Sequence, residues 1–136
     1  MLWRRQKVKA SNVECCGGNG LNKRTVGNDY EKTAGKYLET QGYEILDYNF
    51  YTRAGEIDLV ARHDDYLVFV EVKYRKDASA GHPFEAISMQ KQKHISKCAL
   101  YYMKKKGLLD MPVRFDVVGI LGDEIQVLQN AFEFVM

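Results

Sequence analysis

The stretch from Gly55 to Tyr74, GEIDLVARHDDYLVFVEVKY, decides the fold of this chain. It contains two runs in which apolar and polar residues alternate, separated by the polar pair Asp64-Asp65. Alternating β-branched and aromatic residues that are interrupted by a short polar turn predict a β-hairpin. We therefore expect two paired strands at the centre of the domain.

The turn also predicts the register of this hairpin. A two-residue turn pairs His63 with Tyr66, and counting outward places Asp58 opposite Glu71. Like charges that face each other destabilise a strand pair, so two facing carboxylates beside a lysine need a reason, and a bound divalent cation supplies one. The polar residues that this register brings to one face are Glu56, Asp58, Glu71 and Lys73.

A second register is possible for the same hairpin. A three-residue loop would shift the pairing by one and send Asp58 and Glu71 to opposite faces. The apolar pattern favours the first register, in which Ile57, Leu59 and Ala61 share a face with Val68, Val70 and Val72. The alternative to metal binding is a solvated charged face with an ion pair between Glu56 and Lys73. That face also carries three apolar residues, Val60, Leu67 and Phe69.

The length and composition predict one domain in a reducing compartment. At 136 residues the chain can bury one core and is too short for two comfortable ones. No apolar run approaches the ~20 residues that span a bilayer, and the basic segment 1–12 lacks the apolar region of a secretory signal. Three cysteines, two of them adjacent, make a poor disulfide framework. We expect a cytoplasmic protein without a membrane segment.

The formal net charge of +2 is unevenly distributed along the chain. Residues 1–27 carry six basic residues against Glu14, a net charge of +5, which leaves −3 on the remaining 109 residues. Residues 1–26 also lack sustained periodicity and include the glycine-rich run 15–20. We therefore expect a flexible basic tail over 1–26 and a single domain over 27–136.

A helix is predicted before the hairpin. Asn28 or Asp29 can cap its start and Gly42 can end it. Glu31 lies at the edge of the core-facing side of this helix. Its position alone favours an interaction with the helix dipole over a functional role.

Strands and loops are predicted on both sides of the hairpin. The strand Tyr43–Phe50 and a loop over 51–55, which carries Arg53, lead into it, and a polar loop over 75–83 leaves it. The final strands are expected over Arg114–Leu121 and Glu124–Leu128, with 130–132 closing the chain.

A second long helix is predicted from Met89 to about Lys106, capped by Ser88 and stopped by Gly107. Surface helices usually interleave both signs of charge, but this one has six lysines and no acid. Two interpretations stay open, a solvated helix face and a face for phosphates. The lysines are Lys91, Lys93, Lys97, Lys104, Lys105 and Lys106.

The predicted order of elements defines the fold class. It is a helix, three strands, a second helix and two further strands. Helices on each side of a three-strand meander, followed by a returning strand, predict an α/β fold around a mixed sheet.

The hairpin acids suit a hard divalent cation. Carboxylate and carbonyl oxygens favour Mg²⁺ or Mn²⁺, and Asp58, Glu71 and the carbonyl of Val72 would offer them. Lys73 could orient an attacking water or neutralise charge that develops on a phosphate. Histidine and cysteine add nothing to this constellation, since Cys98 belongs to an apolar helix stripe and the histidines look incidental. These are His63, His82 and His94.

The residues also carry a family resemblance. Asp58 followed by Glu71-Val72-Lys73 resembles the active-site signature of the PD-(D/E)XK nuclease superfamily. Residues 27–135 resemble the YraN family of predicted endonucleases, which is related to archaeal Holliday-junction resolvases. The motifs that carry this resemblance are Gly27-x-x-x-Glu31-x-x-Ala34, Gly55-Glu56-Ile57-Asp58-Leu59, Phe69-Val70-Glu71-Val72-Lys73 and Arg114-Phe115-Asp116-Val117-Val118. It implies a restriction-endonuclease-like αβββαβ core.

The resemblance assigns roles to individual positions. Asp58 and Glu71 match the metal-binding acids and Lys73 the catalytic lysine. Glu31 matches a helix acid that reaches the metal, which overturns the preference for a dipole role. Three further positions are typical of the family, namely Glu56, Lys91 and Asp116, of which Asp116 has no clear path to the metal. The sequence departs from the superfamily pattern at Ile57, in place of proline, and at Tyr51, in place of a common basic residue.

These observations predict a Mg²⁺- or Mn²⁺-dependent endonuclease that hydrolyses phosphodiester bonds in DNA, branched DNA included. Two alternatives are a DNA-binding module of the same fold with little or no turnover, and a structural protein with a vestigial acidic face. A homodimer is compatible with the resemblance. The residues expected to contact DNA are Lys91, Lys93, Lys97 and Arg53.

Overall fold

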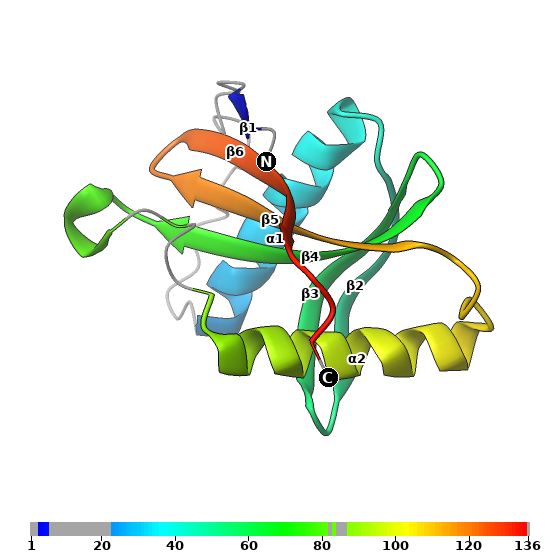
Figure 1. Cartoon of the computed structure of the whole chain (residues 1–136). Helices are drawn as coiled ribbons and strands as arrows, with labels where there is room; N and C mark the ends of the chain where they lie inside the picture. Colours follow the sequence, from blue (N-terminus) through cyan, green and yellow to red (C-terminus); the bar gives the residue numbers. More distant parts are fainter. Residues whose placement is uncertain (1–2, 6–22, 82, 84–86, 136) are drawn as a thin grey trace.

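The computed structural model describes residues 3–5, 23–81, 83 and 87–135. Two long helices and six strands make up most of this part of the chain (Figure 1). Their bounds are β1 Trp3–Arg5, α1 Lys23–Thr40, β2 Glu44–Thr52, β3 Gly55–His63, β4 Tyr66–Arg75, the 3₁₀ turn η1 Ala78–Ala80, α2 Met89–Lys106, β5 Val113–Leu121 and β6 Glu124–Phe132.

The strands form one mixed sheet in the order β1-β6-β5-β4-β3-β2. Strands β4 and β5 are parallel, because α2 carries the chain back between them, and the other neighbours are antiparallel. The helices pack on opposite faces of the sheet, with α1 behind the strands in Figure 1 and α2 across the β2–β3 hairpin. This confirms the predicted α/β fold, which is consistent with a restriction-endonuclease-like core.

Each helix buries its apolar stripe against one side of the sheet. From α1, Ala34, Tyr37 and Leu38 pack on a cluster that includes Leu59 and Val70. From α2, the stripe packs on the other face, and each fully buried large apolar side chain contributes about 1.5–3 kcal/mol. The buried residues of that stripe are Ile95, Cys98, Ala99, Tyr102 and Met103.

The bounds of α2 agree with the sequence prediction, because local capping determines both ends. The Ser88 Oγ accepts a hydrogen bond of 3.1 Å from the Lys91 backbone N–H, a contact worth about 1 kcal/mol. At the other end Gly107 has a φ of 69°, and its N–H donates to the carbonyls of Met103 and Lys104. A left-handed backbone of this kind favours glycine. No described helix combines the length and apolarity needed to cross a membrane.

Three boundaries differ from the prediction. Helix α1 starts at Lys23 rather than at Asn28 or Asp29, because residues with good helix propensity can extend a helix beyond a capping signal. Strand β6 continues to Phe132 instead of ending at Leu128. Strand β1, inside the segment expected to be a tail, pairs with β6. The rest of that predicted tail, 6–22, lies outside the described residues.

The central hairpin has the predicted register over its first half. His63 pairs with Tyr66, and the pairing continues in step to Leu59 opposite Val70. Beyond this row the two strands part: β3 stays paired with β2 as far as Gly55, whereas β4 stays paired with β5 as far as Arg75. Figure 1 shows β4 turning away from the β2–β3 hairpin at this point. We call this divergence the fork.

The fork also changes which face each residue occupies. Leu59 belongs to the cluster against α1, whereas Ile57 belongs to the cluster against α2. The prediction that Ile57 shares a face with Leu59 is therefore wrong, because strict alternation is interrupted at Asp58. Asn49 lies opposite Asp58 in β2 and has a left-handed φ of 54°. An irregular backbone at this row accounts for the change of face.

Candidate metal and phosphate site

Three buried acids meet at the fork, one from each of three elements. Glu31 of α1, Asp58 of β3 and Glu71 of β4 are only 9%, 7% and 5% exposed. We call these three residues the acid cluster. Glu31 lies well beyond the first turn of α1, so the dipole role suggested by position alone is wrong.

The acids contact one another and the surrounding backbone. The Asp58 Oδ2 accepts a hydrogen bond of 2.9 Å from the Val72 N–H. The Glu31 carboxyl is hydrogen-bonded to the side chains of Asp58 and Asn49. Among the described residues, the Oε2 atoms of Glu31 and Glu71 are buried without a hydrogen-bond partner. Buried polar atoms normally have partners, so these two oxygens suggest a ligand.

Burial and like charge make this cluster costly to ionise. Burial raises the pKa of Asp58 to about 8, with the charge of Glu71 adding to the rise and the Val72 N–H opposing it. Burial also raises the pKa of Glu31, although its hydrogen bonds to Asp58 and Asn49 act in the other direction. The shared hydrogen bond between Glu31 and Asp58 requires a proton between two carboxyl groups. A cation at this position would favour releasing that proton.

Two lysines approach the cluster from different elements. The Nζ of Lys73 lies 3.3 Å from the Glu71 Oε1, and the Nζ of Lys91 lies 3.6 Å from the same oxygen. Lys73 was expected at the acids from its place in the hairpin. Lys91 was expected only as a DNA contact, and no local pattern could place the start of α2 beside β4. Both side chains are partly exposed, at 23% and 34%.

The other predicted residues lie around the cluster or outside it. The charge of Glu56 raises the pKa of both Glu31 and Asp58, which places it at the rim of the cluster. Lys93 and Lys97 are exposed on α2, and Arg53 is exposed at the β2–β3 turn. Asn49, which contacts Glu31, was missed because an asparagine within a strand gives no local signal.

A second buried acid lies in a different setting, which we call the Asp116 cluster. Asp116 is fully buried and accepts hydrogen bonds from the Tyr43 hydroxyl, from two nitrogens of Arg114 and from the Asn130 N–H, all at 2.7–2.9 Å. His63, predicted to be incidental, lies 2.8 Å from Arg114 through its Nδ1 and stacks on Tyr43. These contacts make Asp116 a structural residue.

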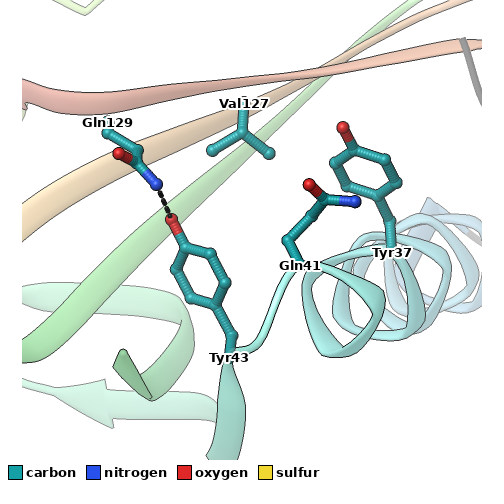
Figure 2. Close-up of a pocket in the computed structure, with 5 residues that line it drawn as sticks. All are labelled: Tyr37, Gln41, Tyr43, Val127 and Gln129. Atoms are coloured by element: carbon teal, nitrogen blue, oxygen red, sulfur yellow. Dashed lines mark hydrogen bonds between the residues drawn. The ribbon is translucent and has the colours of Figure 1, made fainter. Parts of the chain in front are cut away.

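The surroundings of Tyr43 leave little space for a ligand. Figure 2 shows Gln129 donating to the Tyr43 hydroxyl, at 3.1 Å. The adjacent cavity has a volume of ≈ 10 Å³ and is lined also by Tyr37, Gln41 and Val127. That is about the space one water requires. Substrate-sized chemistry therefore belongs to the acid cluster.

The donor set at the fork fits a hard divalent cation. In the described part of the chain, no group of three or more His, Cys, Asp or Glu side chains is already arranged to hold a metal ion. The acid cluster nevertheless offers carboxylate oxygens that have no hydrogen-bond partner, on Glu31 and Glu71. Mg²⁺ takes few carboxylates and keeps several waters, so it does not need a closed protein cage. Asp58 and Glu71 would hold it with Glu31 beside them.

Comparison with known proteins places the chain in a family. Its residues 30–120 match the model described as "Uncharacterised protein family UPF0102". The chain belongs to the UPF0102 family, also known as YraN. The family match spans α1, the fork and α2 up to β5, and so it includes the whole acid cluster.

Curated relatives resemble the chain over most of its length. A UPF0102 protein of Lachnoclostridium phytofermentans is 49% identical over 114 residues, covering 83% of this chain and 97% of the relative. A UPF0102 protein of Acetivibrio thermocellus is 43% identical over 125 residues, covering 85% and 96%. One of Geobacter sulfurreducens is 46% identical over 108 residues, covering 76% and 84%. Membership in UPF0102 agrees with the motifs read from the sequence.

Proposed function

We propose that this UPF0102 protein is a Mg²⁺- or Mn²⁺-dependent endonuclease that hydrolyses phosphodiester bonds in DNA, branched DNA included. The single observation that supports this most strongly is the acid cluster. Three buried carboxyls from α1, β3 and β4 meet at the fork with two unpartnered oxygens and two lysines at one carboxylate. A purely structural cluster would satisfy its buried oxygens, because an unpaired buried polar group costs about 1–3 kcal/mol.

The residues divide the work between binding the cation and handling the phosphate. Asp58 and Glu71 would hold the ion, with Glu31 and the carbonyl of Val72 as further oxygen donors. Bound there, Mg²⁺ or Mn²⁺ would lower the pKa of a ligated water and neutralise charge on the phosphate. Holding these carboxylates close together before the ion arrives reduces the reorganisation needed on binding.

Lys73 is placed to act on the reacting phosphate. Its Nζ lies at the edge of the cluster, 3.3 Å from Glu71 and still partly exposed. A fixed ammonium group at this position would stabilise negative charge that develops on the phosphate oxygens, or orient the attacking water. Lys91 holds the other side of the same carboxylate.

The exposed basic residues would bind the DNA backbone. Lys93 and Lys97 are exposed on α2, and Arg53 is exposed at the β2–β3 turn, on elements that both border the cluster. Contacts of this kind carry no sequence information and weaken with salt. They position a strand rather than select a sequence.

The test is a cleavage assay on supercoiled, linear, single-stranded and four-way junction DNA with Mg²⁺ or Mn²⁺. We expect Lys73→Met and Glu71→Gln to lower the rate at saturating DNA by at least about 10²-fold, as for the loss of one transition-state contact. Lys76→Met is the matched control, since Lys76 lies three residues further on and is exposed. Equal rates for Lys73→Met and Lys76→Met would contradict the role of Lys73. DNA retention without any product from the wild type would favour a binding module instead.

A further inference from the structure

One large aromatic side chain projects from the protein beside the acid cluster. Tyr51, at the end of β2, is 59% exposed. It pairs directly with Glu56 of β3, and cross-strand partners place their side chains on the same face. The charge of Glu56 acts on both Glu31 and Asp58. Tyr51 therefore lies at the rim of the acid cluster, on the same face as Glu56.

The neighbours of Tyr51 show that its ring is not needed for packing. Phe50 and Ile57, which pair with each other in the preceding row, face α2 and belong to its core cluster. Tyr51 belongs to the opposite face and to neither core cluster. Arg53, two residues further along at the turn, is exposed as well. An aromatic plane and a cation thus stand together next to the three acids.

Such a pair matches one nucleotide of a single strand. Bases stack on exposed aromatic rings whatever their sequence, and a nearby cation holds the phosphate. A base within a duplex is already stacked on both sides and cannot offer its face to Tyr51. Only an unpaired nucleotide can place its base on this ring while its phosphate approaches the acids.

The burial of the acids favours the same class of substrate. They are only 5–9% exposed at the bottom of the fork, and the β2–β3 hairpin projects past α2 on one side (Figure 1). Duplex DNA is stiff over about 150 bp and costs energy to bend. A strand with unpaired nucleotides is flexible enough to enter the fork.

We propose that Tyr51 is a stacking platform for an unpaired base next to the phosphate bound at the acid cluster, so that the substrate is DNA with single-stranded character at the cleaved bond. This inference rests on the proposed function, and it specifies the substrate class of the same site. Arg53 holds the backbone of the stacked nucleotide. Glu56, directly across from Tyr51, lies between the ring and the acids.

The test measures binding rather than cleavage, by fluorescence anisotropy with Ca²⁺ in place of Mg²⁺. The probes are labelled oligothymidylate, a blunt duplex, and the same duplex with an unpaired bulge. We expect Tyr51→Leu to weaken binding of oligothymidylate and of the bulged duplex by about 5- to 150-fold, the factor for stacking one base. Binding of the blunt duplex should change less than about twofold, and Tyr51→Trp should retain binding of all three probes.

Tyr101→Leu is the matched control. Tyr101 is 65% exposed, more than Tyr51, but it lies ten residues along α2 from Lys91, a separation of about 15 Å. We expect this variant to bind every probe as the wild type does. Equal losses in the two leucine variants, or an equal loss of duplex and single strand in Tyr51→Leu, would overturn the proposal.

Sedimentation of the free protein covers the other use of this surface. β2 is an edge strand of the sheet, so a second copy could pair there. A wild-type dimer that becomes monomeric in Tyr51→Leu would overturn the stacking role. Failure of the nuclease assay alone leaves the selective binding loss measurable, and cleavage with unselective binding would reject only the stacking platform. The two proposals therefore fail separately.

Discussion

The acid cluster and the Asp116 cluster both bury carboxyl groups, but they solve the problem of burial in opposite ways. Asp116 is fully buried with four hydrogen-bond donations from Tyr43, Arg114 and Asn130. Asp58 accepts from the Val72 N–H and otherwise faces the carboxyls of Glu31 and Glu71. Burial alone therefore does not identify a functional acid. The kind of partner does, because like-charged partners persist only where something else compensates them.

The largest expected effect lies in the structural cluster. Asp116→Ala leaves Arg114 buried and unpaired, so we expect it to lower the free energy of unfolding by about 3–5 kcal/mol. Urea denaturation measures this. Asp58→Ala, which removes a repelled acid, should cost far less in metal-free buffer. The comparison breaks down if the two variants lose the same stability.

A cation should stabilise only through the acid cluster. Mg²⁺ or Mn²⁺ at about a hundredfold excess over its Kd should raise the free energy of unfolding by about 2.7 kcal/mol, followed as the change in Tm. Asp58→Asn should abolish the shift, whereas Asp123→Asn, in the exposed β5–β6 turn, should retain it. An equal rise in all three proteins would show that the ion acts elsewhere.

A smaller loss is expected on removing one donor to Asp116. Tyr43→Phe keeps the ring stacked on His63 and deletes only the hydroxyl that donates to the carboxylate. Hydrogen bonds to charged groups contribute about 1.5–3 kcal/mol, so a loss of about 2 kcal/mol is expected in urea denaturation. Metal affinity in the same variant should stay at the wild-type value. A change in metal affinity would indicate that the two clusters are coupled.

The smallest expected effect is a slope of stability with pH. The pKa of Asp58 is raised to about 8 in the folded protein, so between its ordinary pKa of about 4 and pH 8 the folded state binds the extra proton. Stability contributed by that proton is present at low pH and is lost as pH rises through about 8, at up to about 1.4 kcal/mol per pH unit.

Denaturation of metal-free protein between pH 5 and pH 8 measures this slope, and Asp58→Asn should flatten it relative to the wild type. A wild-type stability that rises with pH over this range, with no difference from Asp58→Asn, would show that Asp58 is ionised in the folded metal-free state.

Local patterns predicted much of the fold and half of the site. Ser88 and Gly107 marked the ends of α2 because capping depends on adjacent residues. The turn after His63 set the hairpin register because alternation has a period of two. Asp58, Glu71 and Lys73 followed from that register, since they lie on the two paired strands.

The rest depended on long-range pairing. The row at which β3 and β4 part is set by their other partners, β2 and β5, and it moved Ile57 to the opposite face. The approach of Glu31 and Lys91 to Glu71 required both helices to begin beside the fork. Residue counting along one strand contains none of these contacts.

The sequence by itself therefore determined the elements, the alternating hairpin and which residues carry charge, because periodicity and capping act over a few neighbours. Only the tertiary structure decided that two strands separate at Asp58 and that acids from three elements meet there. It also separated this cluster from that of Asp116, because the partner of a buried charge is chosen by packing between distant segments.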